Sequence, residues 1–557
     1  MTTTSLGGSL RQPLELKLAE ENRQWTERIT QLTWAFVAVG VAIRLIRYLL
    51  KFPLWGDEML LVENLLDRGY ADLTQPLNNF QCAPLLFLGV ELTAMKLLGF
   101  SEWSMRLFPT LCSIGGLFLF RHVAGRVVRG LPLLLAVAVF AVSFYPVRHG
   151  AEIKPYASDL TVSLVLLALA IEAWRSPQQS RWLWLLAAAA PVAIGLSFPA
   201  VFVAGGISLG LTWQAWRAGW RPRLALASYN LAIVAAFALF AALSFRGQFD
   251  HTGEFMRRYW SASFPPLADP LKLAGWLFST HTGELFAYPF GGENCGSILT
   301  SIGFAAGAWL LARRRQYTLL GIVAGVFGLA LLAAALRRYP YGDNSRLVQY
   351  LAPLICLLAG LGWAGLVAGI RSANWQRLGL SGAVVALFVC GAGIAVFDMV
   401  HPYKHRVELV HRGFARWFWT EHLAGSDVVC LSVPPATGTT ANNLERCSYR
   451  CLQRIYAPQL AMAPPEVIAA RVAAARDSQR PIRYVRYSST SAALDDAGRT
   501  AWINEVQCRY DFIGHERFAV TLNTPNVKTL IGEYNVYEFA RRPEPGLAEA
   551  PRAGLMR

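Results

Sequence analysis

The sequence predicts a polytopic α-helical membrane protein, with about eleven transmembrane helices followed by a small extracytoplasmic α/β domain. The 557 residues are 54% hydrophobic and only 16% charged, with a mean hydropathy of +0.34, whereas soluble domains are about a quarter charged. Uncharged runs follow one another from residue 29 to residue 397. Near Asp398 the composition becomes that of a soluble domain, so we expect a transmembrane domain over 29–397 and a soluble domain over 398–557.

The transmembrane helices are predicted from apolar length, because a helix needs about 20 apolar residues to cross the hydrocarbon layer and fewer where its flanks can snorkel. The stretch 182–216 holds no charge and is too long for one crossing, and we divide it at Pro199, which favours a break. The predicted spans are 29–50, 106–123, 131–147, 156–174, 182–197, 199–216, 224–245, 296–312, 316–336, 347–370 and 378–397.

The apolar segment 83–100, "APLLFLGVELTAMKLLGF", differs from these because it carries Glu91 and Lys96 in its body. Counting it as a span would also put every later basic loop on the outside. We therefore expect an amphipathic helix that lies at the outer interface, within a first outer loop of residues 51–105.

Basic residues indicate the orientation in the membrane. The net charge of +16 and the pI near 9.6 do not indicate a nucleic-acid partner, because the Lys and Arg residues lie in short clusters between apolar runs. With residues 1–28 in the cytoplasm and the first apolar run kept as a span, every inner loop is basic. These loops hold Arg121, Arg126 and Arg129; Arg175 and Arg181; Arg217, Arg221 and Arg223; Arg313, Arg314 and Arg315; and Arg371 and Arg377.

The C-terminal domain is predicted to be a small α/β domain. Strand-like runs "DVVCLSV", "IRYVRY" and "YNVYEFA" surround a helical "PPEVIAARVAAARDSQ". Outside the cell, one or two disulfides can form among Cys430, Cys447, Cys451 and Cys508, and zinc at Cys447 and Cys451 is the alternative.

Charged and aromatic residues gather in three segments predicted to lie outside, next to the bilayer: "WGDEM" from residue 55, "RHGAEIKPYASD" from 148 and "RRYPYGDNSR" from 337. External arginines run against the orientation rule, and guanidinium and ammonium groups are suited to binding a phosphate. The candidate catalytic residues are Asp57 and Glu58, and the candidate substrate-binding residues are Glu152, Lys154, Tyr156, Arg337, Arg338, Tyr339 and Arg346.

These groups suit the transfer of a sugar from a polyprenyl phosphate. A carboxylate, Asp57, would take the proton of the acceptor hydroxyl as it attacks the anomeric carbon, with Glu58 orienting Asp57 or the acceptor. Lys154 and the three external arginines would stabilise the departing phosphate. A phosphate leaves without the second acid that a glycoside hydrolase needs.

The order of these motifs resembles the GT-C glycosyltransferases, and within them the bacterial relatives of protein O-mannosyltransferases and of the lipid A aminoarabinose transferase. The resemblance covers roughly residues 30–370 and includes "WGDE", "LLGFSEWSMRLFPTL", "AEIKPYASD" and "RLVQYLAPLICLLAG". It implies a bacterial inner-membrane enzyme with a polyprenyl-phosphate sugar donor, an extracytoplasmic site, inversion at the anomeric carbon and an essential aspartate that matches Asp57. Where relatives often have a Lys, Gln or His before a double proline, this chain has "QCAPLL", with Gln81 and Pro84.

Each candidate also has a purely structural interpretation. Acids favour a helix N-terminus, which would explain Asp57 and Glu58. Glu152 and Lys154 could form a solvated pair with Tyr156 in an interfacial aromatic belt, the external arginines could anchor in headgroups, and so could Arg44 and Arg47. The outer loop 246–295, with its His and Glu residues, has two interpretations: a lid that covers the site, or a structural or surface loop.

The sequence leaves the cofactor unknown, since a divalent metal is possible but no ligand spacing indicates one. The acceptor is equally open. The alternative functions are another polyprenyl-linked transferase or ligase and a polytopic transporter or flippase, although the internal repeats typical of transporters are not visible.

Overall fold

The computed structural model describes residues 8–342, 344–422, 428–432, 440–457, 481–489, 504, 507, 510–524 and 527–542. The chain divides into two compact units. The helical unit comprises residues 1–52 and 67–402, and the mixed unit comprises residues 53–66 and 403–557. The mixed unit thus takes in part of the predicted first outer loop together with the predicted C-terminal domain.

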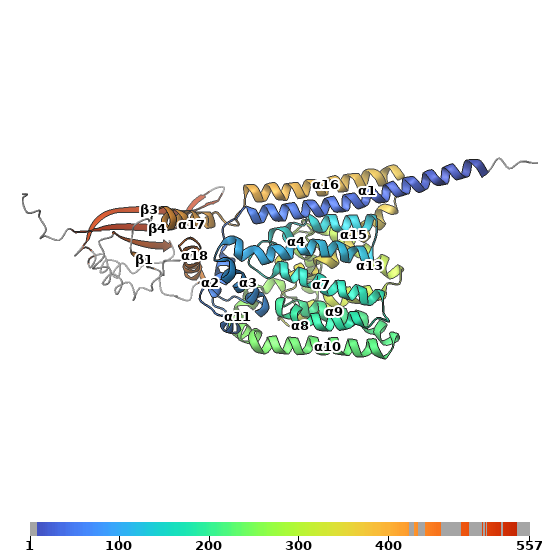
Figure 1. Cartoon of the computed structure of the whole chain (residues 1–557), viewed down its shortest axis with the longest axis horizontal. Helices are drawn as coiled ribbons and strands as arrows, with labels where there is room; N and C mark the ends of the chain where they lie inside the picture. Colours follow the sequence, from blue (N-terminus) through green and yellow to red (C-terminus); the bar gives the residue numbers. More distant parts are fainter. Residues whose placement is uncertain are drawn as a thin grey trace, which may run out of the picture. The chain divides into compact units, whose positions relative to one another are not determined.

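The helical unit is a bundle in which the predicted apolar segments fall on helices (Figure 1), although the segment 131–147 is interrupted after Ala141 and the segment 347–370 begins in a 3-10 helix. The helices that carry these segments are α1 (Gly8–Leu49), α4 (Glu102–Val127), α5 (Leu131–Ala141), α7 (Tyr156–Arg175), α8 (Arg181–Leu196), α9 (Ala200–Ala218), α10 (Trp220–Phe240), α13 (Ile298–Arg313), α14 (Tyr317–Ala335), α15 (Ala352–Ala368) and α16 (Ala373–Val400). Further elements connect them: η1 (Ala71–Thr74), α3 (Leu85–Leu98), α6 (Phe144–Arg148), η2 (Ala241–Phe245), α11 (Arg246–Tyr259), η3 (Ser261–Ser263), α12 (Pro270–Thr282), η4 (Glu284–Phe286) and η5 (Ser345–Leu351).

The membrane class predicted from the sequence is confirmed at the level of the helices. Among the described residues, seven helical stretches are long and apolar enough to cross a membrane. They begin at Arg23, Glu102, Tyr156, Trp220, Tyr317, Ser345 and Ala373. Helices α5, α8 and α13 are apolar but shorter, so the predicted count of eleven full crossings stays a prediction.

Small residues let neighbouring helices of the bundle approach closely, the usual basis of helix packing in membranes. A Cβ added at Gly206 in α9 would collide with the backbone of Val326 in α14, and one at Gly362 in α15 would collide with the backbone of Gly303 in α13. Helix α16 lies alongside α1 (Figure 1), where Phe388 stacks on Phe36 with 4.2 Å between ring centroids.

The helix predicted over 83–100 is α3, whose 14 residues span about 21 Å, less than the ~30 Å of the hydrocarbon layer. Its length agrees with an interfacial rather than a crossing helix. Lys96 is exposed and lies 4.5 Å from the centre of the Tyr70 ring, whereas Glu91 is fully buried. The expected amphipathic character is therefore incomplete, because one of its two charges faces the protein interior.

The mixed unit packs three helices, α2 (Gly56–Leu66), α17 (Arg406–Arg416) and α18 (Thr440–Tyr456), and the π-helical turn η6 (Trp417–His422) with a four-stranded sheet. The strands are β1 (Val428–Ser432), β2 (Ile482–Ser489), β3 (Tyr510–Thr524) and β4 (Val527–Arg541), in the order β1-β2-β4-β3. β1 runs parallel to β2, and the other neighbours are antiparallel. The core includes Phe414, which stacks on Tyr534 with 3.9 Å between ring centroids.

The predicted α/β class of this domain is confirmed for its described part, since β1, β2 and β4 fall on the predicted strand runs. β3 was not predicted, because polar and apolar residues alternate less regularly in its sequence than in the runs that were predicted as strands. The helix predicted near residues 464–479 lies outside the described residues. Cys447 and Cys451 are buried, and the disulfide prediction stays open because the side chains of Cys430 and Cys508 lie outside the described part.

Candidate active-site residues

The segment between α6 and α7 carries charged side chains into the interior of the helical unit. His149, Glu152, Lys154 and Tyr156 are at most 8% exposed, with Glu152 fully buried. Glu152 Oε2 lies 2.9 Å from His149 Nδ1, and Lys154 Nζ donates to Gln81 Oε1 at 2.6 Å. The interpretation of Glu152 and Lys154 as a solvated pair is therefore wrong. Buried charges within a multispanning bundle are costly and usually functional.

Two tyrosines flank the His149 ring and extend this buried group. Tyr145 lies parallel to it at 6.0 Å, and Tyr156 meets it edge-on at 5.5 Å. The Tyr145 hydroxyl donates to Glu284 Oε1 at 3.1 Å, and the Ser345 hydroxyl donates to the other oxygen of the same carboxylate. Glu284 thus joins the loop predicted as a lid to the segments before α7 and before α15.

His149, Tyr145, Glu284 and Ser345 were not predicted as site residues. Tyr145 and His149 lie shortly before "AEIKPYASD", and Ser345 lies within "RRYPYGDNSR", but nothing in the sequence distinguished them from their neighbours. Glu284 was one of several acids in the loop 246–295. A linear sequence does not show that these segments meet, because Glu284 lies 139 residues after Tyr145 and 61 residues before Ser345.

Two of the three predicted arginines lie against aromatic rings. Arg337 and Arg338 follow α14 and are exposed, and the Arg338 guanidinium lies 5.0 Å from the centre of the Phe249 ring. Arg346, at the start of η5, lies 5.2 Å from the centre of the Trp260 ring. Stacking on the α11 region holds two of these cations in place, an arrangement compatible with phosphate binding and with headgroup anchoring alike.

Tyr339 is turned inward, unlike the arginines beside it. Its hydroxyl donates to the Leu347 carbonyl at 3.1 Å, and its ring meets Phe202 edge-on at 5.4 Å. These contacts close the turn between α14 and η5. A substrate-binding role for Tyr339 stays a prediction.

In the mixed unit, Asp57 and Glu58 occupy the first turn of α2, and their environments differ. Glu58 is fully buried, and its Oε2 accepts the Trp55 N–H at 3.0 Å. This contact fixes the turn that begins the helix, as acids at a helix N-terminus commonly do. The side chain of Asp57 is only half-buried, so of the two carboxylates it is the better placed to meet a substrate.

Glu408, at the start of α17, contacts the same turn. Its Oε1 accepts the Gly56 N–H at 3.3 Å, and its Oε2 accepts the N–H groups of Lys404 and His405, each at 3.2 Å. Burial, together with the nearby Glu58 carboxylate, raises the pKa of Glu408 to about 7. The Lys404 ammonium lies 3.5 Å from the centre of the Trp55 ring. No sequence signal links residues so far apart.

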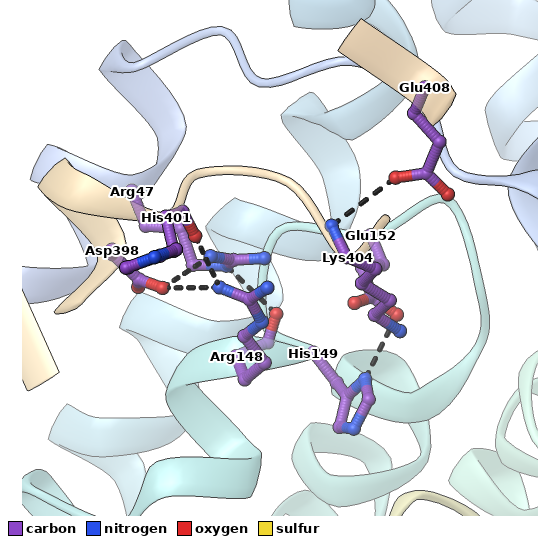
Figure 2. A network of polar contacts seen from close by, with 8 residues as sticks. All are labelled: Arg47, Arg148, His149, Glu152, Asp398, His401, Lys404 and Glu408. Carbon is purple, nitrogen blue, oxygen red and sulfur yellow. Dashed lines mark hydrogen bonds and ion pairs between the residues drawn. The ribbon is translucent and has the colours of Figure 1, made fainter. Parts of the chain in front are cut away.

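A second buried ionic group, in the helical unit, joins α1, α6 and α16 (Figure 2). Arg47 Nη1 and Arg148 Nη1 each lie 2.6 Å from Asp398 Oδ1, and Arg47 Nε donates to the Arg148 carbonyl at 2.8 Å. Figure 2 also shows the His149–Glu152 contact and, between residues of the mixed unit, that of Lys404 with Glu408.

The expectation that Arg44 and Arg47 anchor in headgroups is wrong, because both are buried. Arg44 donates to Ser113 Oγ at 3.0 Å and to the Ala141 carbonyl at 2.8 Å, which ties α1 to α4 and α5. Hydropathy places such arginines near a helix end but does not show which face of the helix they occupy.

Among the residues whose side chains the structure describes, no three His, Cys, Asp or Glu side chains gather as a metal-binding group.

Comparisons with known proteins found no matching protein-family profile and no matching curated protein sequence. Among solved structures, ArnT from Cupriavidus metallidurans bound to undecaprenyl phosphate matches with a TM-score of 0.49 and 14% identity, over 91% of this chain and 98% of ArnT. The oligosaccharyltransferase of Archaeoglobus fulgidus matches with a TM-score of 0.45 and 8% identity, over 92% and 75% of the two chains.

A third match is the arabinofuranosyltransferase AftD from Mycobacteria, with a TM-score of 0.39 and 15% identity, over 90% of this chain and 40% of AftD. At these identities and TM-scores no residue's role passes from these proteins to this chain. The chain is thus similar to these three solved membrane enzymes in overall fold, and the similarity goes no further.

Proposed function

We propose that this protein is a membrane glycosyltransferase that moves a sugar from a polyprenyl-phosphate donor to an acceptor on the extracytoplasmic face, with inversion at the anomeric carbon. The observation that supports it best is the buried group before α7, where Glu152, Lys154 and His149 are held inside a multispanning bundle. A bundle of apolar helices does not need these charges for stability, whereas a site for a charged lipid phosphate does.

In the proposed reaction, Asp57 takes the proton of the acceptor hydroxyl while the hydroxyl oxygen bonds to the anomeric carbon. The bond between that carbon and the phosphate oxygen breaks, and its electron pair leaves with the polyprenyl phosphate. Lys154 and arginines among Arg337, Arg338 and Arg346 stabilise the phosphate charge. Glu58, committed to the Trp55 N–H, keeps the helix turn in place beside Asp57.

The test is a transfer assay in reconstituted membranes with a panel of radiolabelled polyprenyl-phosphate sugars. Asp57→Asn should abolish transfer while donor binding is kept, because the amide cannot accept the proton. Asp67→Asn, the same change at an exposed position, is the matched control and should keep wild-type transfer. Full activity of Asp57→Asn would remove Asp57 from the mechanism.

The same panel separates the alternative functions. A transporter or flippase would move the labelled lipid across the membrane with its sugar–phosphate bond intact, and another polyprenyl-linked transferase would use a donor outside the sugar panel. The predicted topology is tested by cysteine labelling on intact cells, where a cysteine at position 57 should react without permeabilisation.

A further inference from the structure

The carboxylate-bearing helix α2 packs with the C-terminal domain rather than with its neighbours in the sequence. Residues 53–66 form one compact unit with residues 403–557, although they lie in the chain directly after α1. Most residues of α2 are buried, including Met59, Val62 and Glu63. The C-terminal domain therefore supplies much of the surface on which this helix folds.

Helix α2 requires such support. It has 11 residues, and isolated helices shorter than about 12–15 residues are marginal in water. Its Glu63 side chain is 2% exposed, so it needs a cation beside it. Arg450 of α18 provides this cation, with Nη1 2.6 Å from Glu63 Oε1, and Cys451 Sγ lies 3.5 Å from the Met59 carbonyl.

The first turn of α2 is held from α17. Glu408 accepts hydrogen bonds from the N–H groups of Lys404 and His405, which directly precede α17, and from that of Gly56, the residue directly before Asp57. One carboxylate thus binds the backbone at the N-termini of two helices. The position of the backbone at Asp57 therefore depends on the position of the N-terminus of α17.

We propose that the C-terminal domain positions Asp57, with Glu408 and Arg450 as positioning residues that hold the two ends of α2. The inference rests on the proposed function, because it assigns these residues a part in the reaction through Asp57. Displacements of about 1 Å at a reacting group can lower a rate about 10²-fold, so weakening either contact should lower kcat and change the KM for the donor little.

The first experiment measures position without activity, by hydrogen exchange of the full-length protein in detergent. Arg450→Met and Glu408→Gln should raise exchange in the peptide 53–66, roughly tenfold or more. The matched control is Arg483→Met, because Arg483 pairs with Glu538 at 2.7 Å between β2 and β4, and neither residue contacts α2 in the described structure. The control variant should show the same hydrogen exchange in the peptide 53–66 as wild type.

The second experiment measures transfer with the donor found active for wild type. Arg450→Met should lower kcat about 10²-fold, whereas Arg450→Lys should retain much of the wild-type kcat. The charge reversal that combines Glu63→Arg with Arg450→Glu should have a higher kcat than either of its two single changes. If Arg450→Met fails to fold, Arg450→Lys and Glu408→Gln provide the test, with kcat below that of Arg483→Met as the expected result.

The outcomes separate the two proposals. Activity of Asp57→Asn contradicts the proposed function. If Asp57→Asn is inactive but Arg450→Met and Glu408→Gln match Arg483→Met in both exchange and kcat, the C-terminal domain does not position Asp57 and this inference is wrong.

Discussion

Removing the charge of Asp398 should strongly destabilise the helical unit, because it leaves two buried guanidinium groups without their shared carboxylate. The side chains of Arg47, Asp398 and Arg148 are 1%, 2% and 9% exposed, and each arginine lies 2.6 Å from Asp398 Oδ1. At an effective dielectric constant of about 20, each pair attracts by about 6 kcal/mol. Desolvation of the three ions offsets most of this attraction in the wild type.

In Asp398→Asn the desolvation of Arg47 and Arg148 remains while the attraction is lost. Breaking a buried ion pair by removing one partner costs about 3–5 kcal/mol, and we expect a loss of that size here. The measurement is the free energy of unfolding of the purified protein, from denaturation titrations in mixed micelles. Glu254→Gln is the control, because Glu254 pairs with Arg258 on the exposed face of α11, where such a pair contributes about 0.5 kcal/mol or less.

A partial recovery should follow when one of the two cations is removed as well. Asp398→Asn with Arg148→Met should be more stable than Asp398→Asn alone, since only one buried guanidinium group, that of Arg47, then lacks the Asp398 carboxylate. An Asp398→Asn protein that unfolds within about 1 kcal/mol of the Glu254→Gln control would refute the reasoning, because it would mean that water reaches these guanidinium groups.

Two further predictions concern the candidate site. Lys154→Met should raise the KM for the lipid-phosphate donor at least about tenfold, the effect expected for one charge-assisted hydrogen bond, and a KM equal to that of wild type would exclude Lys154 from donor binding. The pKa of Glu408, raised from 4.5 to about 7, means that between these values the folded chain holds a proton that the unfolded chain has released. The thermal midpoint of wild type should therefore fall relative to that of Glu408→Gln as pH rises from about 4.5 to 7, and the difference should be level above about 7. Glu58, Lys404 and His405 face the same carboxyl group, and parallel pH courses of the two proteins would contradict this assignment.

The sequence alone determined the fold class of the protein, which is a polytopic helical bundle with an α/β domain, and also the helical segments and much of the C-terminal sheet. These features depend on local properties, since apolar length predicts a helix such as α14 and alternation predicts a strand such as β2. It also singled out Asp57, Lys154 and the arginines Arg337, Arg338 and Arg346, because charged residues beside long apolar runs are unusual.

The tertiary structure decided which of those charges are buried and what they contact. Asp398 marked a change of composition in the sequence, and the structure adds that it is the counter-ion of Arg47 and Arg148. Glu58 was predicted to orient Asp57 or the acceptor but is buried in the helix turn, and Glu408 gave no sequence signal at all. Burial and ion pairing depend on side chains hundreds of residues apart in the chain, and only the folded chain brings such side chains together.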